Sequence, residues 1–183
     1  MKNNIIKNLI NAFIMSVGLS SCSSSESDYI PAIASTLGNN VFLSIEKKDG
    51  KEYDCKDILL RKEISIYGNE SKEVIHLGLA KYNGKKVLNF NANLPDRTSM
   101  KYNSEKTEGH GHSDMTISFK NKNTKIRFYY KLIIEKPDYM GMNAIYIDSI
   151  ECKERKIKPK ENSNIYVFTL KENTDGELII KPK

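Results

Sequence analysis

The chain has 183 residues and a formal net charge of +6, a length that fits one globular domain rather than several. Its 29 basic and 23 acidic residues are interspersed, so the positive surplus forms no continuous basic stripe of the kind that binds nucleic acid. We therefore expect no nucleic-acid partner. The chain contains no tryptophan but 10 tyrosines, which leaves tyrosine as the residue able to stack on a sugar.

Residues 1–21 have the pattern of a secretion signal. Two lysines stand near the start, and residues 9–19 are mostly apolar. This run is shorter than the roughly 18 apolar residues that a membrane-spanning helix needs, and it is typical of the apolar core of a signal peptide. Two small serines stand directly before Cys22, whose thiol is the nucleophile that a lipid-transfer reaction requires.

Residues 19–22, Leu-Ser-Ser-Cys, resemble the lipobox of a bacterial type II lipoprotein signal peptide. The serine-rich residues 23–28 are similar to the tether of Bacteroidota-type surface lipoproteins. The resemblance implies that residues 1–21 are removed, that Cys22 carries acyl chains, and that the protein is held at the outer membrane or cell surface. Two or more acyl chains give a stable anchor. The alternative is an ordinary cleaved secretory signal with a chance cysteine.

After the signal, the sequence predicts a tether and one domain. Residues 22–38 are rich in serine, proline, alanine and glycine and have no sustained hydrophobic period, which predicts a flexible, disordered spacer. Residues 39–183 are predicted to form a single domain.

This domain consists of short β segments separated by turn residues. Strands are predicted at residues 41–46, 58–66 (with a short helical turn before it), 74–82, 87–90, 115–119, 125–135, 144–152, 165–170 and 177–180. Asn83-Gly84 predicts a tight hairpin turn because both residues tolerate a positive φ. The polar residues 91–113 are predicted to form a long loop.

The number of strands and the scarcity of a helical period predict an all-β fold, an immunoglobulin-like antiparallel β-sandwich. The clearest strand is 125–135, in which apolar residues alternate with polar ones, as a half-buried antiparallel strand requires. The same resemblance to small Bacteroidota surface lipoproteins implies one sandwich domain after a lipid tether. The strand order stays open at this point.

Of the three cysteines, one is expected to carry lipid and the other two to form a pair. If Cys22 carries lipid, Cys55 and Cys152 remain as an even pair in an oxidising compartment. We predict a disulfide between them, which would close a loop of nearly one hundred residues and stabilise the fold by roughly 4–5 kcal/mol. Two buried free thiols are the alternative.

A metal site is the first functional hypothesis. His110, His112 and Asp114 lie within six consecutive residues, and together they could supply three ligands to a tetrahedral zinc ion. A polar loop with two solvated histidines is the alternative.

Two further groups could contact a ligand. Tyr139, Met140 and Met142 stand between two predicted strands, where an aromatic ring and flexible methionines would give an adaptable surface. Tyr129 and Arg127 lie on the polar face of the strand 125–135. The alternatives are a loop folded back on the core and an ordinary cross-strand pair.

No sequence motif for catalysis is visible. The chain has neither a Gly-x-Ser-x-Gly elbow nor a glycine-rich phosphate loop, and we expect no enzymatic activity and no cofactor. The sequence predicts a membrane-anchored, non-enzymatic binding or accessory module for a glycan or protein ligand. The alternatives are an envelope-assembly lipoprotein that contacts other membrane proteins and a metal-binding protein. The oligomeric state is left open.

Overall fold

The computed structural model describes residues 34–134, 143–153, 155–159 and 165–183. Contacts within the chain divide it into two units, residues 1–30 and residues 31–183, and all the described residues belong to the second unit. The predicted lipidation site Cys22 lies outside the described residues, as do Tyr139, Met140 and Met142 of the predicted contact loop.

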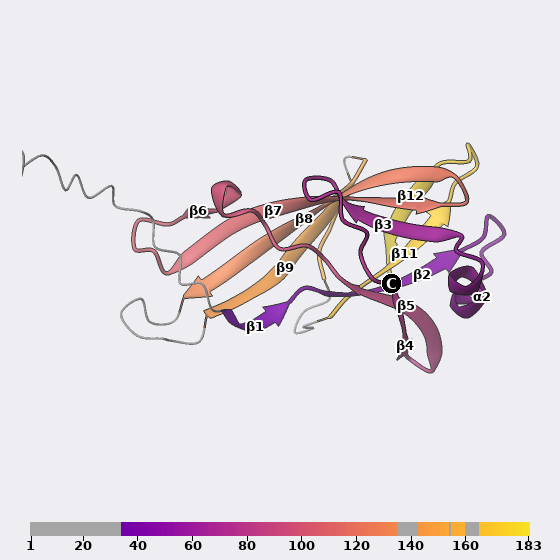
Figure 1. Cartoon of the computed structure of the whole chain (residues 1–183), viewed down its shortest axis with the longest axis horizontal. Coiled ribbons are helices and arrows are strands. Elements are labelled where there is room, and N and C mark those ends of the chain that lie inside the picture. Colours follow the sequence, from indigo (N-terminus) through magenta and orange to yellow (C-terminus); the bar gives the residue numbers. More distant parts are fainter. Residues whose placement is uncertain (1–33, 135–142, 154, 160–164) are drawn as a thin grey trace, which may run out of the picture. The chain divides into compact units, whose positions relative to one another are not determined.

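Seven strands form the first sheet, sheet A (Figure 1). They are β1 (Ala34–Gly38), β3 (Ile64–Gly68), β6 (Lys101–Tyr102), β7 (Glu108–Phe119), β8 (Lys122–Ile134), β9 (Asn143–Cys152) and β10 (Arg155–Ile157). The order is β1-β9-β8-β7-β3, with β10 also beside β9 and β6 also beside β7. The long strands β7, β8 and β9 form the centre of this sheet.

Five strands form the second sheet, sheet B. They are β2 (Asn40–Glu46), β4 (Gly78–Tyr82), β5 (Lys85–Asn91), β11 (Ile165–Glu172) and β12 (Leu178–Pro182), in the order β12-β11-β2-β5-β4. Two short helices complete the described elements, α2 (Cys55–Leu60) and the 3₁₀ turn η1 (Arg97–Ser99). In the part of the chain that the structure describes, no helix has the length and apolar character to cross a membrane.

The mostly β fold is confirmed, but the purely antiparallel pairing predicted for it is wrong. Both sheets are mixed, because β1 pairs with β9 and β11 pairs with β2 in parallel. One of the sheets is curled into a half-barrel. A parallel pair requires a long crossover connection, and between β2 and β11 the chain passes through all the central strands of sheet A. Short apolar segments alone do not reveal such a connection.

The predicted tether, residues 22–38, extends too far toward the C-terminus. Residues 34–38 form the strand β1, in which Leu37 pairs with Ile145 of β9. The side chain of Leu37, the one large apolar residue of this strand, remains 54% exposed. A hydrophobic period is therefore missing from it.

Both sheets contribute to one hydrophobic core. The buried cluster includes Leu43, Phe90 and Phe168 from sheet B and Ile66, Met115 and Phe128 from sheet A. In β8 the alternation predicted from the sequence is confirmed, since every second residue from Thr124 to Ile134 is buried. The intervening residues face away from the core, as the period of two requires.

The segment Gly109-His110-Gly111-His112 is part of the long strand β7, which begins at Glu108. The loop predicted for residues 91–113 therefore extends too far. Gly109 and Gly111 face inward and are buried, while the two histidines face outward. A Cβ at Gly111 would lie 2.9 Å from the Cβ of Pro95 and closer still to Met100. Residues 92–100, which connect β5 to β6 and which we call the crossing segment, contain both Pro95 and Met100. Glycine is needed at position 111 because the crossing segment packs directly against the strand.

Positive φ angles occur both at residues that tolerate them and at lysines, which usually avoid them. Asn83 and Gly84 have φ angles of 47° and 77° and connect β4 to β5 as the predicted hairpin. Among the described residues, in contrast, lysine takes a positive φ at five positions. These are Lys62, Lys72, Lys106, Lys120 and Lys153.

Replacing Lys62 with glycine is expected to stabilise the protein by about 0.5–1 kcal/mol. Lys62 follows the end of α2 with a φ of 53°. Its N–H donates to Leu59 O at 3.1 Å, and Glu63 N–H donates to Ile58 O at 3.1 Å. This is a Schellman ending, in which glycine is preferred because a Cβ is strained in the left-handed region. Chemical denaturation measures the change.

The control for this variant is Lys56→Gly in the first turn of the same helix. There the backbone is helical, so glycine is expected to lower the free energy of unfolding. A stability loss in Lys62→Gly equal to that in Lys56→Gly would contradict the assigned ending of the helix.

The structure does not contain the predicted disulfide between Cys55 and Cys152. Both are buried free thiols. Cys152, at the end of β9, has its Sγ 3.3 Å from Thr124 Oγ1 of β8, within sheet A. Cys55 begins α2 and interacts with the backbone of Leu88 in sheet B, and burial raises the pKa of its thiol. The two sulfurs have separate partners on different elements, and counting cysteines could not show this.

Candidate functional site

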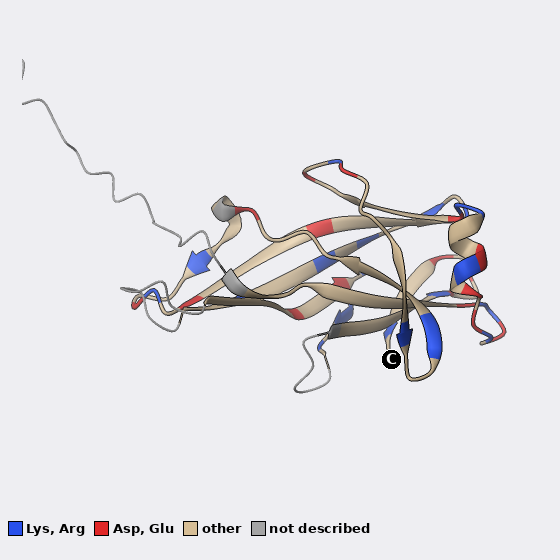
Figure 2. Cartoon of the chain, turned by 60° about the horizontal axis from the view of Figure 1, so that its bottom comes forward, with Lys and Arg blue, Asp and Glu red and all other residues tan. Residues whose placement is uncertain are grey.

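Five of the residues singled out in the sequence lie together on one face of sheet A. His110, His112 and Asp114 face outward from β7, and Arg127 and Tyr129 face outward from its neighbour β8. The register places Asp114 opposite Arg127 and His112 opposite Tyr129. Acidic and basic segments are interleaved along these strands rather than separated by sign (Figure 2).

Arg127 is paired with Asp114 within this face. Its Nε donates to Asp114 Oδ1 at 2.7 Å and its Nη2 to Asp114 Oδ2 at 2.8 Å. These hydrogen bonds hold the pKa of Asp114 below its usual value and raise the pKa of Arg127. A ligand would have to displace a bidentate, charge-assisted pair in order to bind either group.

Tyr129 is engaged in the same way. Its hydroxyl donates to Glu151 Oε2 at 2.6 Å, and this hydrogen bond raises the pKa of Tyr129. The Nζ of Lys156 lies 4.2 Å from the centre of the tyrosine ring, a distance typical of a cation–π contact. Asp114, Arg127 and Tyr129 on the outer face of sheet A therefore already have partners within the protein.

The predicted metal site is not formed. Among the residues that the structure describes, no three histidine, cysteine or carboxylate side chains gather so as to hold a metal ion. Of the three proposed ligands, Asp114 has both carboxylate oxygens bonded to Arg127. His110 instead pairs with Glu108, at 2.8 Å between Nε2 and Oε1.

The pair of Asp114 and Arg127 predicts a pH dependence of stability. Since the folded state lowers the pKa of Asp114, its stabilising effect is complete above the unfolded pKa of about 3.9 and is lost as the pH falls through the folded pKa. Arg127→Met is expected to lower the free energy of unfolding by roughly 1 kcal/mol at pH 7. This difference should shrink toward pH 2 in urea titrations.

The matched control is Lys125→Met, which replaces an exposed cation two residues away on the same face of β8. Its effect at pH 7 should stay within about 0.5 kcal/mol. A loss in Arg127→Met that is the same at every pH would show that the ion pair is not its cause.

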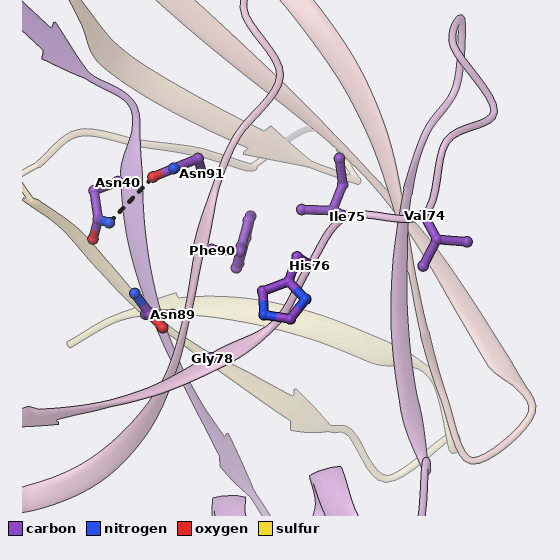
Figure 3. A pocket seen from close by; sticks show the side chains of 8 residues that line it. All are labelled: Asn40, Val74, Ile75, His76, Gly78, Asn89, Phe90 and Asn91. Atoms are coloured by element: carbon purple, nitrogen blue, oxygen red, sulfur yellow. Dashed lines mark hydrogen bonds between the residues drawn. The ribbon is translucent and has the colours of Figure 1, made fainter.

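A different surface feature, on sheet B, has the form of a ligand site (Figure 3). It is a cleft of about 350 Å³, within the size range of small-molecule pockets. The lining residues are Asn40, Val74, Ile75, His76, Gly78, Asn89, Phe90 and Asn91. None of them is lysine, arginine, aspartate or glutamate, and we call this hollow the asparagine cleft.

Three asparagine side chains form one side of the asparagine cleft. Asn89 and Asn91 are two residues apart on β5 and therefore share a face, and Asn40 lies opposite Asn91 on β2. Asn40 Nδ2 donates to Asn91 Oδ1 at 3.2 Å (Figure 3). Gly78 lies opposite Asn89, and a Cβ at Gly78 would overlap Asn89 Oδ1. Glycine thus allows the Asn89 amide to lie across the start of β4.

One of these amides is incompletely paired. Asn40 Oδ1 is buried and accepts no hydrogen bond from the residues that the structure describes. A buried acceptor without a donor costs about 1–3 kcal/mol. Such groups are rare in folded proteins and mark places where a partner is needed.

The other side of the asparagine cleft is less polar. Residues 74–77 connect β3 to β4, and Ile75 N–H donates to Ile66 O at 2.7 Å, which fixes this segment beside β3. Val74 is 71% exposed and Phe90 only 2%, so valine lies at the rim and phenylalanine lies inward. The imidazole of His76, which also lines the cleft, is exposed (Figure 3).

Two other hollows on the described surface are lined by charged residues. The first, of about 290 Å³, contains Glu70, Glu73, Asp96 and Asp114. The second, of about 480 Å³, contains Glu52 and Lys85, whose side chains are paired at 3.0 Å. The asparagine cleft differs from both in having no charged side chain in its lining.

The sequence analysis missed the asparagine cleft. The available signal was Asn89 and Asn91 at a spacing of two on a predicted strand, which places both amides on one face. The third amide, Asn40, is far away in the sequence and reaches the site only through the pairing of β2 with β5. Comparisons with protein-family models, curated proteins and solved structures found no match to the chain.

Proposed function

We propose that the chain is a lipid-anchored surface protein whose β body is a non-enzymatic binding module, with the asparagine cleft as its ligand site. The main support is the chemistry of the cleft. In a protein whose residues are 28% charged, eight lining residues include three amides and no ionised carboxylate, ammonium or guanidinium group. Such a lining fits an uncharged polar ligand, because a charged ligand would lose hydration without gaining a counter-charge.

The same lining supports binding rather than chemistry. General acid–base catalysis and covalent catalysis need a titratable or nucleophilic group in contact with the reacting atoms. Among the eight lining residues only His76 can transfer a proton, and there is no serine, cysteine, lysine or carboxylate to act with it. The amides can orient a ligand but cannot exchange protons with it near neutral pH.

The anchor is proposed from the sequence of residues 19–28. Acylation of Cys22 would place the body next to a membrane, and the twelve residue-to-residue steps from Cys22 to Ala34 could span at most on the order of 40 Å. The asparagine cleft would then bind its ligand beside the surface to which the chain is attached.

Two measurements test this function. The first compares the full chain with its Cys22→Ala variant after expression in a bacterium that exports lipoproteins. The full chain should be recovered with membranes and the variant in the soluble fraction, since the variant lacks the thiol that accepts lipid. Equal distribution of the two proteins would refute the anchor.

The second measurement tests the asparagine cleft. An envelope extract is separated by charge, and each fraction is added to the full chain in detergent while the melting temperature is followed. The uncharged fraction should raise the melting temperature, as any ligand of the folded state does, and Asn91→Ala should abolish the rise. A rise with charged fractions only, or an equal rise in Asn91→Ala, would refute the assignment.

A further inference from the structure

We infer that the ligand of the asparagine cleft is a neutral glycan, with its hydroxyl groups at the three amides and a carbon face against the side formed by residues 74–76. This inference rests on the proposed function, because it names the ligand class of the same site. The chemistry of three groups of lining residues supports it.

The amides match hydroxyl groups. A side-chain amide offers one acceptor oxygen and two N–H donors, and a sugar hydroxyl both donates and accepts. Asn40 and Asn91 are directly opposite on neighbouring strands, with Cβ atoms roughly 5 Å apart, and Asn89 is about 7 Å further along β5. Several hydroxyls on one ring can therefore be bound at once.

The unpaired oxygen of Asn40 needs a donor in particular. Asn40 Nδ2 is already used by Asn91, while Asn40 Oδ1 has no partner among the described residues. Rotation of this amide would give up its hydrogen bond to Asn91 and turn its oxygen toward the cleft, where ligand hydroxyls could donate both to this oxygen and to the released Asn91 Oδ1. A purely apolar ligand would leave this oxygen and the neighbouring amides without partners, which is unfavourable.

The opposite side suits the carbon face of a sugar. Val74 and His76 line the asparagine cleft, and both are exposed, so that their carbon atoms can contact a ligand. Pockets for small ligands typically combine such an apolar side with a few polar groups that fix the orientation. The volume of about 350 Å³ is near the lower end of the range for such pockets and suits a short saccharide.

Two other ligand classes fit less well. An acidic sugar or a phosphate would require a cation, and none of the eight lining residues is lysine or arginine. A peptide bound by strand addition would use a row of backbone N–H and C=O groups on a sheet edge. The polar groups of the lining are mainly side-chain amides, and these belong to β2 and β5 in the interior of sheet B.

Calorimetric titration of the full chain tests the inference, in a detergent whose head group contains no sugar. The probes are glucose, galactose, mannose and N-acetylglucosamine, each also as a β-linked tetrasaccharide, together with glucuronic acid and an end-blocked tetra-alanine peptide. At least one neutral saccharide should bind saturably. Glucuronic acid should bind at least about tenfold more weakly, because it meets no counter-charge.

Three variants locate the bound saccharide. Asn91→Ala and Asn89→Ala should each weaken binding about tenfold, the loss expected for one or two hydrogen bonds. Gly78→Ala should weaken it at least threefold, because its Cβ displaces the Asn89 amide without removing a polar group. Asn123→Ala, an exposed asparagine on β8, is the matched control and should bind normally. Melting temperatures verify that each variant is folded.

The outcomes separate this inference from the proposed function. No binding of any neutral saccharide, together with binding of the blocked peptide that is lost in Asn91→Ala, would overturn the glycan and leave an uncharged ligand in the asparagine cleft. Saccharide binding unchanged in Asn89→Ala, Asn91→Ala and Gly78→Ala would overturn the site itself.

Discussion

Replacing Phe128 with alanine is expected to lower the free energy of unfolding by about 3–5 kcal/mol, the cost typical of removing a buried phenylalanine side chain. Phe128 is 1% exposed and lies in β8, the central strand of the order β1-β9-β8-β7-β3. It belongs to the hydrophobic cluster that also contains residues of sheet B. The cavity would therefore weaken the packing of both sheets.

Urea denaturation followed by circular dichroism measures this loss. Phe128→Leu is the matched control, because leucine fills part of the cavity and should cost roughly 1–2 kcal/mol. Since a domain of this size is stable by only about 5–15 kcal/mol, Phe128→Ala should also melt well below the native protein. A loss smaller than about 1 kcal/mol would mean that β8 does not lie in a shared core.

The second large effect is expected at Gly111. Its Cβ position lies 2.9 Å from Pro95 Cβ and closer still to Met100, so Gly111→Val would force the crossing segment away from β7. Overpacking of this kind costs about 1–3 kcal/mol, and the branched side chain of valine places the expected loss at the upper end. Urea denaturation measures it.

His112→Val is the control for this variant, because it introduces the same side chain one residue later on the opposite face of β7. His112 is half-buried on the outer face, and its replacement should change stability by less than about 0.5 kcal/mol. Equal losses of stability in Gly111→Val and His112→Val would be expected if this segment were a solvated loop. They would contradict its assignment to the strand β7.

The contrast between these two positions shows what a local pattern can and cannot establish. In β8 the inward residues are large and apolar, and the alternation alone predicted the strand and its buried face. In the first half of β7 the inward residues are Gly109, Gly111 and Ser113, which give no hydrophobic signal and are of types common in loops. Glycine is required at position 111 because Pro95 and Met100 pack against it. The sequence alone does not reveal this contact.

Long-range pairing limited the other predictions. The parallel neighbours β2 and β11 are separated by more than one hundred residues, and no local pattern indicates which strands meet across such a distance. The same limit explains the cysteines, because Cys55 and Cys152 lie against different strands, β5 and β8. It also explains the asparagine cleft, whose third amide, Asn40, comes from β2.

The sequence did locate a functional-looking set of side chains, but it could not show their partners. His110, His112, Asp114, Arg127 and Tyr129 do lie on one face. Their polar character reflects a solvent-facing network of ion pairs and hydrogen bonds, with Glu108 and Glu151 as members that the sequence analysis did not include. Charge and aromaticity alone do not distinguish such a network from a binding surface.

The asparagine cleft can be tested most directly by nuclear magnetic resonance of the isotope-labelled full chain in detergent, titrated with the uncharged fraction of an envelope extract. The side-chain amide resonances of Asn40, Asn89 and Asn91 should shift saturably, while that of Asn123 on sheet A should stay fixed. Saturable shifts at Asn123 and at the outer face of β7 and β8, with the three cleft amides unchanged, would contradict the account and place the binding surface on sheet A.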